Sequence, residues 1–101
     1  MANVFKRITN TATTIDTSFY ITPPGTTSII IGFTASNKNA SQGDITVRIN
    51  SIFLVKDVPI PSGSTLSLLD GKMVLEEGDT LYVSSSSNDS VDLILSAMER
   101  S

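Results

Sequence analysis

Hydrophobic and polar residues alternate along most of this chain with a period of two. The clearest example lies within residues 44–50, where Ile45, Val47 and Ile49 alternate with polar neighbours. Successive side chains of a strand point to opposite faces, so this stretch predicts a strand with one buried and one wet face. Other runs, rich in Ile, Val, Thr and Phe, are separated by clusters of Gly, Pro, Asn and Ser, as is typical of sandwiches and barrels.

This spacing predicts eight or nine short strands in one unit. The predicted ranges are residues 3–9, 18–22, 27–36, 44–50, 51–55, 65–69, 73–75, 80–84 and 91–98. We expect an all-β fold, an antiparallel two-sheet β-sandwich of jelly-roll or immunoglobulin-like type with about eight strands. A small closed barrel is the alternative. The length of 101 residues fits one domain, with an N-terminal strand that can act as an arm over residues 1–17 and the sandwich over 18–101.

The alternation also assigns a core. In the third predicted strand, Ile29, Ile31 and Phe33 are expected inside, and Ile30 is expected on the opposite face. Tyr20 and Tyr82 are expected to point outward. The predicted core is Phe19, Ile21, Ile29, Ile31, Phe33, Ile45, Val47, Ile49, Leu54, Leu66, Leu68, Val74, Leu81, Val83, Val91, Leu93 and Leu95.

Several apolar residues lie on the faces opposite this core series. The run from Ser51 to Val55 is apolar on both faces, which fits either a central buried strand or a strand covered by another subunit. Two explanations stay open for such residues: a second buried side of the sandwich, or a subunit interface. The candidate interface residues are Ile30, Phe53, Val55, Tyr82 and Ile94.

The residue inventory argues against catalysis. The chain has no cysteine and no histidine, which excludes a Ser-His-Asp triad, a cysteine nucleophile and imidazole or thiolate metal sites. The six glycines are isolated, so no glycine-rich phosphate loop occurs. The residue types for a catalytic serine with lysine as its base are present, but no lysine stands in a motif with a serine. We therefore expect a protein that is not an enzyme and needs no cofactor.

Carboxylates provide the remaining candidate chemistry. Glu76, Glu77 and Asp79 fall in one expected turn, and their oxygens are weak candidates for binding Ca²⁺ or Mg²⁺. The favoured explanation is a solvated turn in which Gly78 supplies the backbone freedom. A glycosidase pair at Glu76 and Glu77 needs a deep cleft, which so short a chain seldom forms.

Charge and hydropathy bound the partners. The net charge is −3, and the seven basic residues are spread along the chain, so no cluster is available to neutralise a row of phosphates. No stretch approaches the roughly 20 apolar residues of a membrane span. The first residues, MANVFKRITN, lack the apolar region of a signal peptide. We expect synthesis in a cytoplasm, with no nucleic-acid or membrane partner.

The second half of the chain carries a series of strand and turn elements. They are Leu54 to Asp57, Pro59 to Pro61, Gly63-Ser64, Gly71-Lys72, Val74 to Glu76, Gly78-Asp79 and Ser90 to Glu99. With these elements, residues 53–101 resemble a group of small structural proteins of tailed bacteriophages, notably those infecting cyanobacteria and other marine bacteria. Residues 20–41 match the same group more loosely.

The resemblance implies a virion component made in a bacterial host, and the group supplies no catalytic residues. We expect a capsid decoration protein that binds the major capsid protein or other virion subunits and forms a homo-oligomer, with a trimer favoured. A tail, neck, baseplate or fibre-attachment subunit is the alternative. An alternative of another class is a free carbohydrate- or calcium-binding module.

Overall fold

The computed structural model describes residues 3–69, 71–86 and 91–100, which form nine strands. The strands are β1 (Asn3–Thr11), β2 (Thr17–Ile21), β3 (Thr27–Asn37), β4 (Gly43–Ile49), β5 (Ile52–Ile60), β6 (Thr65–Ser67), β7 (Met73–Leu75), β8 (Thr80–Ser85) and β9 (Val91–Arg100). Within these described ranges no helix is long and apolar enough to cross a membrane.

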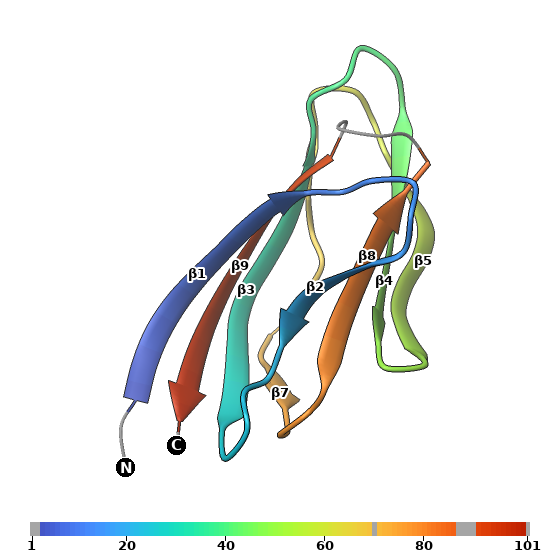
Figure 1. Ribbon diagram of the computed structural model, residues 1–101. Coiled ribbons are helices and arrows are strands. Elements are labelled where there is room, and N and C mark those ends of the chain that lie inside the picture. The colour runs from blue at the N-terminus through green and yellow to red at the C-terminus, as the bar shows by residue number, and fades with distance from the viewer. Residues whose placement is uncertain (1–2, 70, 87–90, 101) are drawn as a thin grey trace.

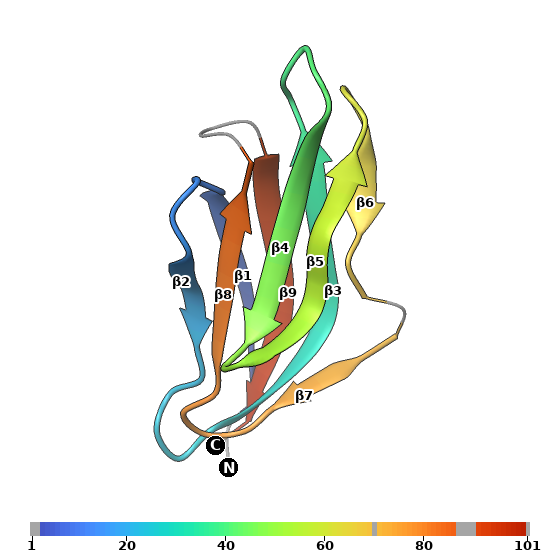
Figure 2. The ribbon, with the colours of Figure 1, turned by 90° about the vertical axis from the view of Figure 1, so that its right-hand side faces the viewer.

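The strands form two antiparallel sheets packed face to face (Figures 1 and 2). The five-stranded sheet has the order β1-β9-β3-β6, with β7 also paired to β3, and the four-stranded sheet has the order β2-β8-β4-β5. The first two strands therefore lie in different sheets, whereas an immunoglobulin sandwich keeps them in one. This order is that of a jelly roll, with β6 and β7 sharing the place of one strand. The expected all-β sandwich is confirmed, and the sheets do not close into a barrel.

The core lies between the two sheets. Phe19 of β2 stacks on Phe33 of β3, with ring centroids 5.6 Å apart, and so joins the layers. The buried apolar residues are Ala12, Phe19, Tyr20, Ile30, Phe33, Ala35, Ile45, Val47, Ile60, Leu68, Leu75, Leu81, Val83, Val91, Leu93, Leu95 and Ala97. Most of the predicted β4, β8 and β9 core residues are among them, because these strands keep an unbroken alternation.

A bulge in β3 overturns the predicted assignment there. The pairing of β3 with β9 shifts between Ile30 and Gly32, so Ile31 is an extra residue without an opposite partner. Ile30 is fully buried, whereas Ile31 is 46% exposed. The prediction that Ile31 is inside and Ile30 outside was therefore wrong. A prediction that assumes strict alternation along the whole strand does not include the inserted residue, so it reverses the faces on one side of the bulge.

Two further positions correct the predicted core for similar reasons. The pairing of β2 with β8 shifts between Ser18 and Tyr20, so Phe19 and Tyr20 are both buried and Ile21 turns outward. Tyr20 was expected outside and Ile21 inside. In β7 the inward residue is Leu75, and the predicted core residue Val74 is exposed.

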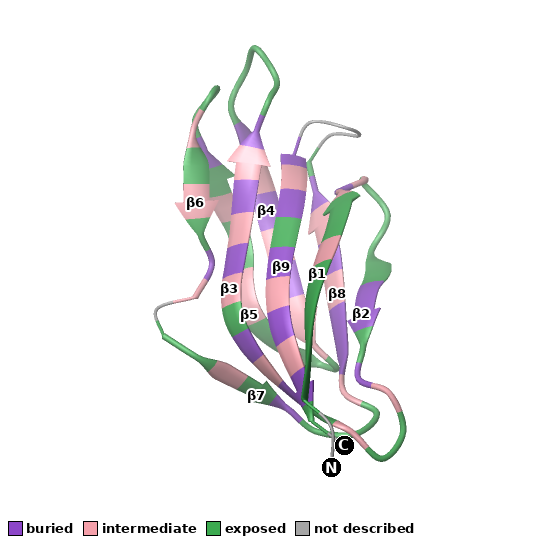
Figure 3. Cartoon of the chain, turned by 90° about the vertical axis from the view of Figure 1, so that its left-hand side faces the viewer, coloured by how far each residue is buried: buried purple, intermediate pink, exposed green. Residues whose placement is uncertain are grey.

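The N-terminal segment, for which we expected a strand and an arm, forms the edge of the five-stranded sheet. β1 pairs with β9 from Asn3 opposite Arg100 to Thr11 opposite Asp92. Its residues are mostly exposed, as the view onto this sheet shows (Figure 3). Backbone bonds from Ala12 N to Val91 O, 2.8 Å, and from Ser85 N to Thr13 O, 2.8 Å, hold the segment that follows.

The bulge generates a paired prediction. Ile30→Ala removes a fully buried side chain and should lower the free energy of unfolding by about 2–4 kcal/mol. Ile31→Ala, one residue further on, should lower it by less than about 1 kcal/mol, because Ile31 is already largely in water. Urea unfolding of both variants and the wild type measures the two losses, and equal losses would contradict the bulged register.

Candidate interaction surfaces

An apolar row crosses the outer face of the five-stranded sheet. The pairing places Phe5 of β1 opposite Met98 of β9, Met98 opposite Ile29 of β3, and Ile29 opposite Val74 of β7. Directly opposite residues point to the same face, and Phe5 and Val74, at the two ends of the row, are 72% and 58% exposed. Met98 and Ile29 between them are half-buried. We call these four residues the apolar row.

The neighbouring positions extend this surface. Ile31, displaced outward by the bulge, stands beside the row, and Ile94 of β9 lies further along the same face, opposite Thr34. Between them lie two small residues, Gly32 and Ser96, which face each other across β3 and β9. The nearest atoms to the place of a Cβ on Gly32 belong to Ser96, 3.9 Å away, so both residues project little from this part of the face.

Charged residues are confined to the margin of this face. The register puts Asp92 on the first outward position of β9, Arg100 on the last, and Arg7 on the edge strand β1, opposite Ser96. Asp92 accepts a hydrogen bond from Thr11 Oγ1, 2.8 Å, and pairs with Lys38 Nζ, 3.0 Å. These two contacts lower the pKa of Asp92, so it stays charged. The centre of the face therefore carries no charged side chain, and its large side chains are apolar.

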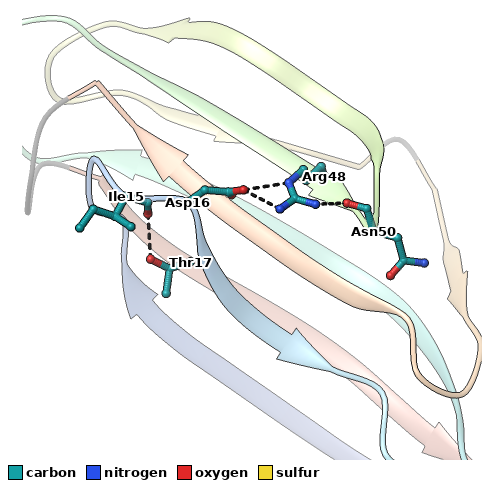
Figure 4. A network of polar contacts seen from close by, with 5 residues as sticks. All are labelled: Ile15, Asp16, Thr17, Arg48 and Asn50. Carbon is teal, nitrogen blue, oxygen red and sulfur yellow. Dashed lines mark hydrogen bonds and ion pairs between the residues drawn. The ribbon is translucent and has the colours of Figure 1, made fainter.

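The outer face of the four-stranded sheet carries a polar network instead (Figure 4). Arg48 of β4 lies over the ring of Tyr82 of β8, 3.8 Å from its centroid. The same guanidinium donates to Asp16 Oδ2 from Nε, 2.9 Å, and from Nη2, 2.6 Å, and to the carbonyl oxygen of Asn50. Thr17 Oγ1 donates to Ile15 O, 2.8 Å, and so fixes the loop that presents Asp16.

β5 is an edge strand of the four-stranded sheet. The prediction that the apolar run of residues 51–55 forms a central buried strand was therefore wrong. Register shifts against β4 separate its apolar residues. Val55 opposes the buried Val47 and packs against the core, whereas Phe53 opposes Arg48 and is 49% exposed. Lys56 Nζ lies 5.1 Å from the centroid of the Phe53 ring.

The structure thus divides the five candidate interface residues. Ile30 is fully buried and Val55 points to the core, so neither belongs to an outer surface. Phe53 and Tyr82 share the outer face of the four-stranded sheet, and Ile94 lies on the other outer face. Sequence reasoning missed the apolar row, because it placed Ile29 and Val74 in the core. The row exists only through the pairing of β1, β9, β3 and β7, which no local pattern reveals.

A buried polar cluster links the two sheets. Tyr20 of β2 donates its hydroxyl to Glu99 of β9, and the same oxygen lies 2.5 Å from Ser28 Oγ of β3. Lys6 Nζ of β1 lies 3.0 Å from Glu99 Oε1. Burial by itself raises the pKa of Glu99, but the bonds from Tyr20 and Lys6 outweigh it, and the pKa is lowered. Burial is the main cause, and the hydrogen bond to Glu99 the second, of a rise in the pKa of Tyr20 to about 12.

Two carboxylates of the acidic turn, those of Asp79 and Glu77, accept hydrogen bonds from other parts of the chain. Asp79 accepts from Asn50 Nδ2, 3.0 Å, and from the backbone N–H of Glu76, 2.9 Å, and Glu77 accepts from Gly25 N. Among the described residues no group of three acidic side chains is placed to hold a metal ion. The structure thus gives this turn a role in joining β4, β8 and the loop before β3.

The Glu99 cluster predicts an acid-sensitive part of the stability. A carboxyl group with a lowered pKa in the folded state stabilises fully above its ordinary pKa, about 4.3, and loses this contribution as the pH falls through the folded value. The difference in unfolding free energy between the wild type and Glu99→Gln should be constant near neutral pH and shrink below about pH 4. Urea unfolding across pH 3–7, roughly the range over which carboxyl groups titrate, measures it.

Tyr20→Phe provides the control for this cluster, because it removes one donor to the carboxylate and keeps the ring. In the Tyr20→Phe background the pH-dependent part of the Glu99→Gln effect should be smaller. A difference that grows as the pH falls would contradict the assigned direction of the pKa.

The Arg48 network predicts an unequal response of two cations that both lie over aromatic rings. Arg48→Ala removes a cation–π contact, an ion pair and a bond to a carbonyl, and should lower the unfolding free energy by about 1–2 kcal/mol. Lys56→Ala removes one longer, exposed contact and should cost less than about 0.5 kcal/mol. Thermal or urea unfolding at two salt concentrations tests this, and equal losses would contradict the network.

No family model matches the chain, and no curated protein matches it. Among solved structures, it is similar to a chain from the structure described as "Bacillus endospore appendages form a novel family of disulfide-linked pili". The TM-score is 0.59 with 12% sequence identity, and the match covers 99% of this chain and 87% of that one. At this identity the likeness shows a shared β-sandwich fold.

Proposed function

We propose that the protein is a non-enzymatic structural subunit that acts by binding other protein subunits. The observation that carries this proposal is the number of large apolar side chains in water. Among the residues that the structure describes, nine are between 45% and 73% exposed: Val4, Phe5, Ile15, Ile21, Ile31, Ile52, Phe53, Val74 and Ile94. Phe5, Ile31, Val74 and Ile94 of this set share the outer face of the five-stranded sheet. Exposed apolar surface that is contiguous on a small protein marks a contact site, and burying it contributes about 25 cal/mol per Å².

The assembly we propose is the virion of a tailed bacteriophage, with the chain as a capsid decoration protein. The support is the resemblance of residues 53–101 to small phage structural proteins, together with a jelly-roll sandwich that offers two broad outer faces. The protein would bind the major capsid protein and stabilise the head by burying apolar surface between subunits. It would be made in the host cytoplasm and function in the virion.

A tail, neck or fibre-attachment subunit is the second candidate. One observation favours it: the similar solved structure is described as belonging to pili, which are filaments. That family is described as disulfide-linked, whereas the present chain has no cysteine. This chain therefore cannot form such disulfides in either location.

Counting copies in purified particles separates these functions. Quantitative mass spectrometry should find this chain in proportion to the major capsid protein, in hundreds of copies per particle, if it decorates the head. A handful of copies would move it to the tail or neck. Complete absence from particles would overturn the virion proposal and direct attention to a free binding module, for which a shift of melting temperature with sugar or Ca²⁺ is the test.

A further inference from the structure

We infer that the outer face of the five-stranded sheet is covered by the same face of a second copy, related by a twofold axis parallel to the strands between β9 and β3. This inference rests on the proposed function, because it names the partner for one of the exposed surfaces. It concerns the apolar row together with Ile31, Ile94, Gly32 and Ser96.

The apolar row is self-complementary under this axis. The rotation places the β1 edge of one copy over the β7 edge of the other and leaves positions along the strands unchanged. The apolar row of one copy therefore meets the apolar row of the other. Phe5 then lies over Val74 of the second copy, and Met98 lies over Ile29 of the second copy. In this dimer the strands of the two facing sheets are nearly aligned, which is a common geometry when two sheets pack face to face.

The large and small side chains of the face also match. Ile31 projects from β3, and the axis places it over β9 of the second copy, near the small residue Ser96. Gly32 faces Ser96 of the second copy in the same way. Each copy thus supplies one large side chain, Ile31, and one site of small residues to receive it, as an interface with twofold symmetry requires.

The distribution of charge and the size of the face fit a stable interface. Arg7, Arg100 and Asp92 lie at the margin and leave an uncharged centre, the arrangement of an apolar interface core with a polar rim. Four strands about 4.8 Å apart and rows spread over about 30 Å give a flat footprint of roughly 570 Å². With side-chain relief this approaches the roughly 800 Å² that each partner buries in a standard interface.

The edges of the sheets are less suited to self-association than this face. β5 contains Asp57 with a φ of 50°, Pro59 without an N–H, and register shifts against β4. β6 and β7 have three residues each, and the edge strand β1 carries Lys6 and Arg7. Bulges, prolines, short strands and lysines are the devices that discourage edge pairing, so the face is the better site for a second copy.

Sedimentation velocity of the full chain over a range of concentrations tests the inference. The wild type should form a dimer at micromolar concentrations. Ile31→Lys should weaken dimerisation at least about tenfold, because the substitution acts twice in a twofold dimer and puts a charge in an apolar centre. Ile52→Lys, at a 70% exposed position in the β4–β5 hairpin, is the matched control and should change it by less than about twofold.

A complementary pair tests the geometry itself. Phe5→Lys and Val74→Glu each alter an exposed end of the row and should each weaken the dimer of that variant. An equimolar mixture should regain dimers, because the introduced lysine would meet the introduced glutamate at one contact while the other contact keeps the natural phenylalanine and valine. Far-ultraviolet circular dichroism checks that each variant retains the fold.

The outcomes are separable. A wild type that stays monomeric up to about 100 μM, or an Ile31→Lys variant that associates like the control, would overturn the inferred dimer. Failure of the mixture to regain dimers would overturn the twofold arrangement. Because these measurements use the isolated protein, the dimer can be established even if particles contain no copies, and copies in particles can be found even if the dimer is refuted.

Discussion

The bulge in β3 is the constraint on which both the core and the outer surface depend. β3 pairs with β9 on one side and with β6 and β7 on the other, so its side chains set the interior of the five-stranded sheet. Because one extra residue enters at Ile31, Ile30 and Phe33 both reach the core, although they are three positions apart. The same insertion turns Ile31 into water and aligns Ile29 with Met98 on the outer face. One backbone irregularity therefore determines what is buried and what is offered for contact.

The sequence was sufficient to predict the strands and the sandwich, because alternation and turn residues are local signals. It assigned the faces correctly in β4, β8 and β9. In β4 and β9 buried and less buried residues alternate without an inserted residue. It failed at Ile21, Ile30 and Ile31, where a bulge inverts the period, and at Val55, where the irregular pairing of β5 turns the side chain inward. The candidate surface needed the register between distant strands, so of the five candidate interface residues only Phe53, Tyr82 and Ile94 were correctly placed on outer faces in advance.

The two outer faces offer different chemistry. On the four-stranded sheet, Arg48 occupies the ring face of Tyr82 and is held by Asp16, so much of the polar capacity of this surface is already used within the chain. On the outer face of the five-stranded sheet the large central side chains are apolar, and the charged residues lie at the edge of the face. Between the sheets, the Tyr20–Glu99–Lys6 cluster joins strands of both layers to the edge strand β1. A protein built in this way keeps its own layers together by internal contacts while leaving an apolar face exposed.

The position of β9 has a consequence for how the chain is made. β9 lies between β1 and β3, yet it is the last strand in the chain, so a growing polypeptide holds β1 and β3 before their common partner exists. Pairings between distant segments form slowly, and unpaired strand edges invite aggregation while they wait. During synthesis, the completed four-stranded sheet would have to shelter these strands until β9 emerges from the ribosome and inserts. The pairing of β9 with β1 and β3 is therefore among the last contacts that a growing chain can form in this sheet.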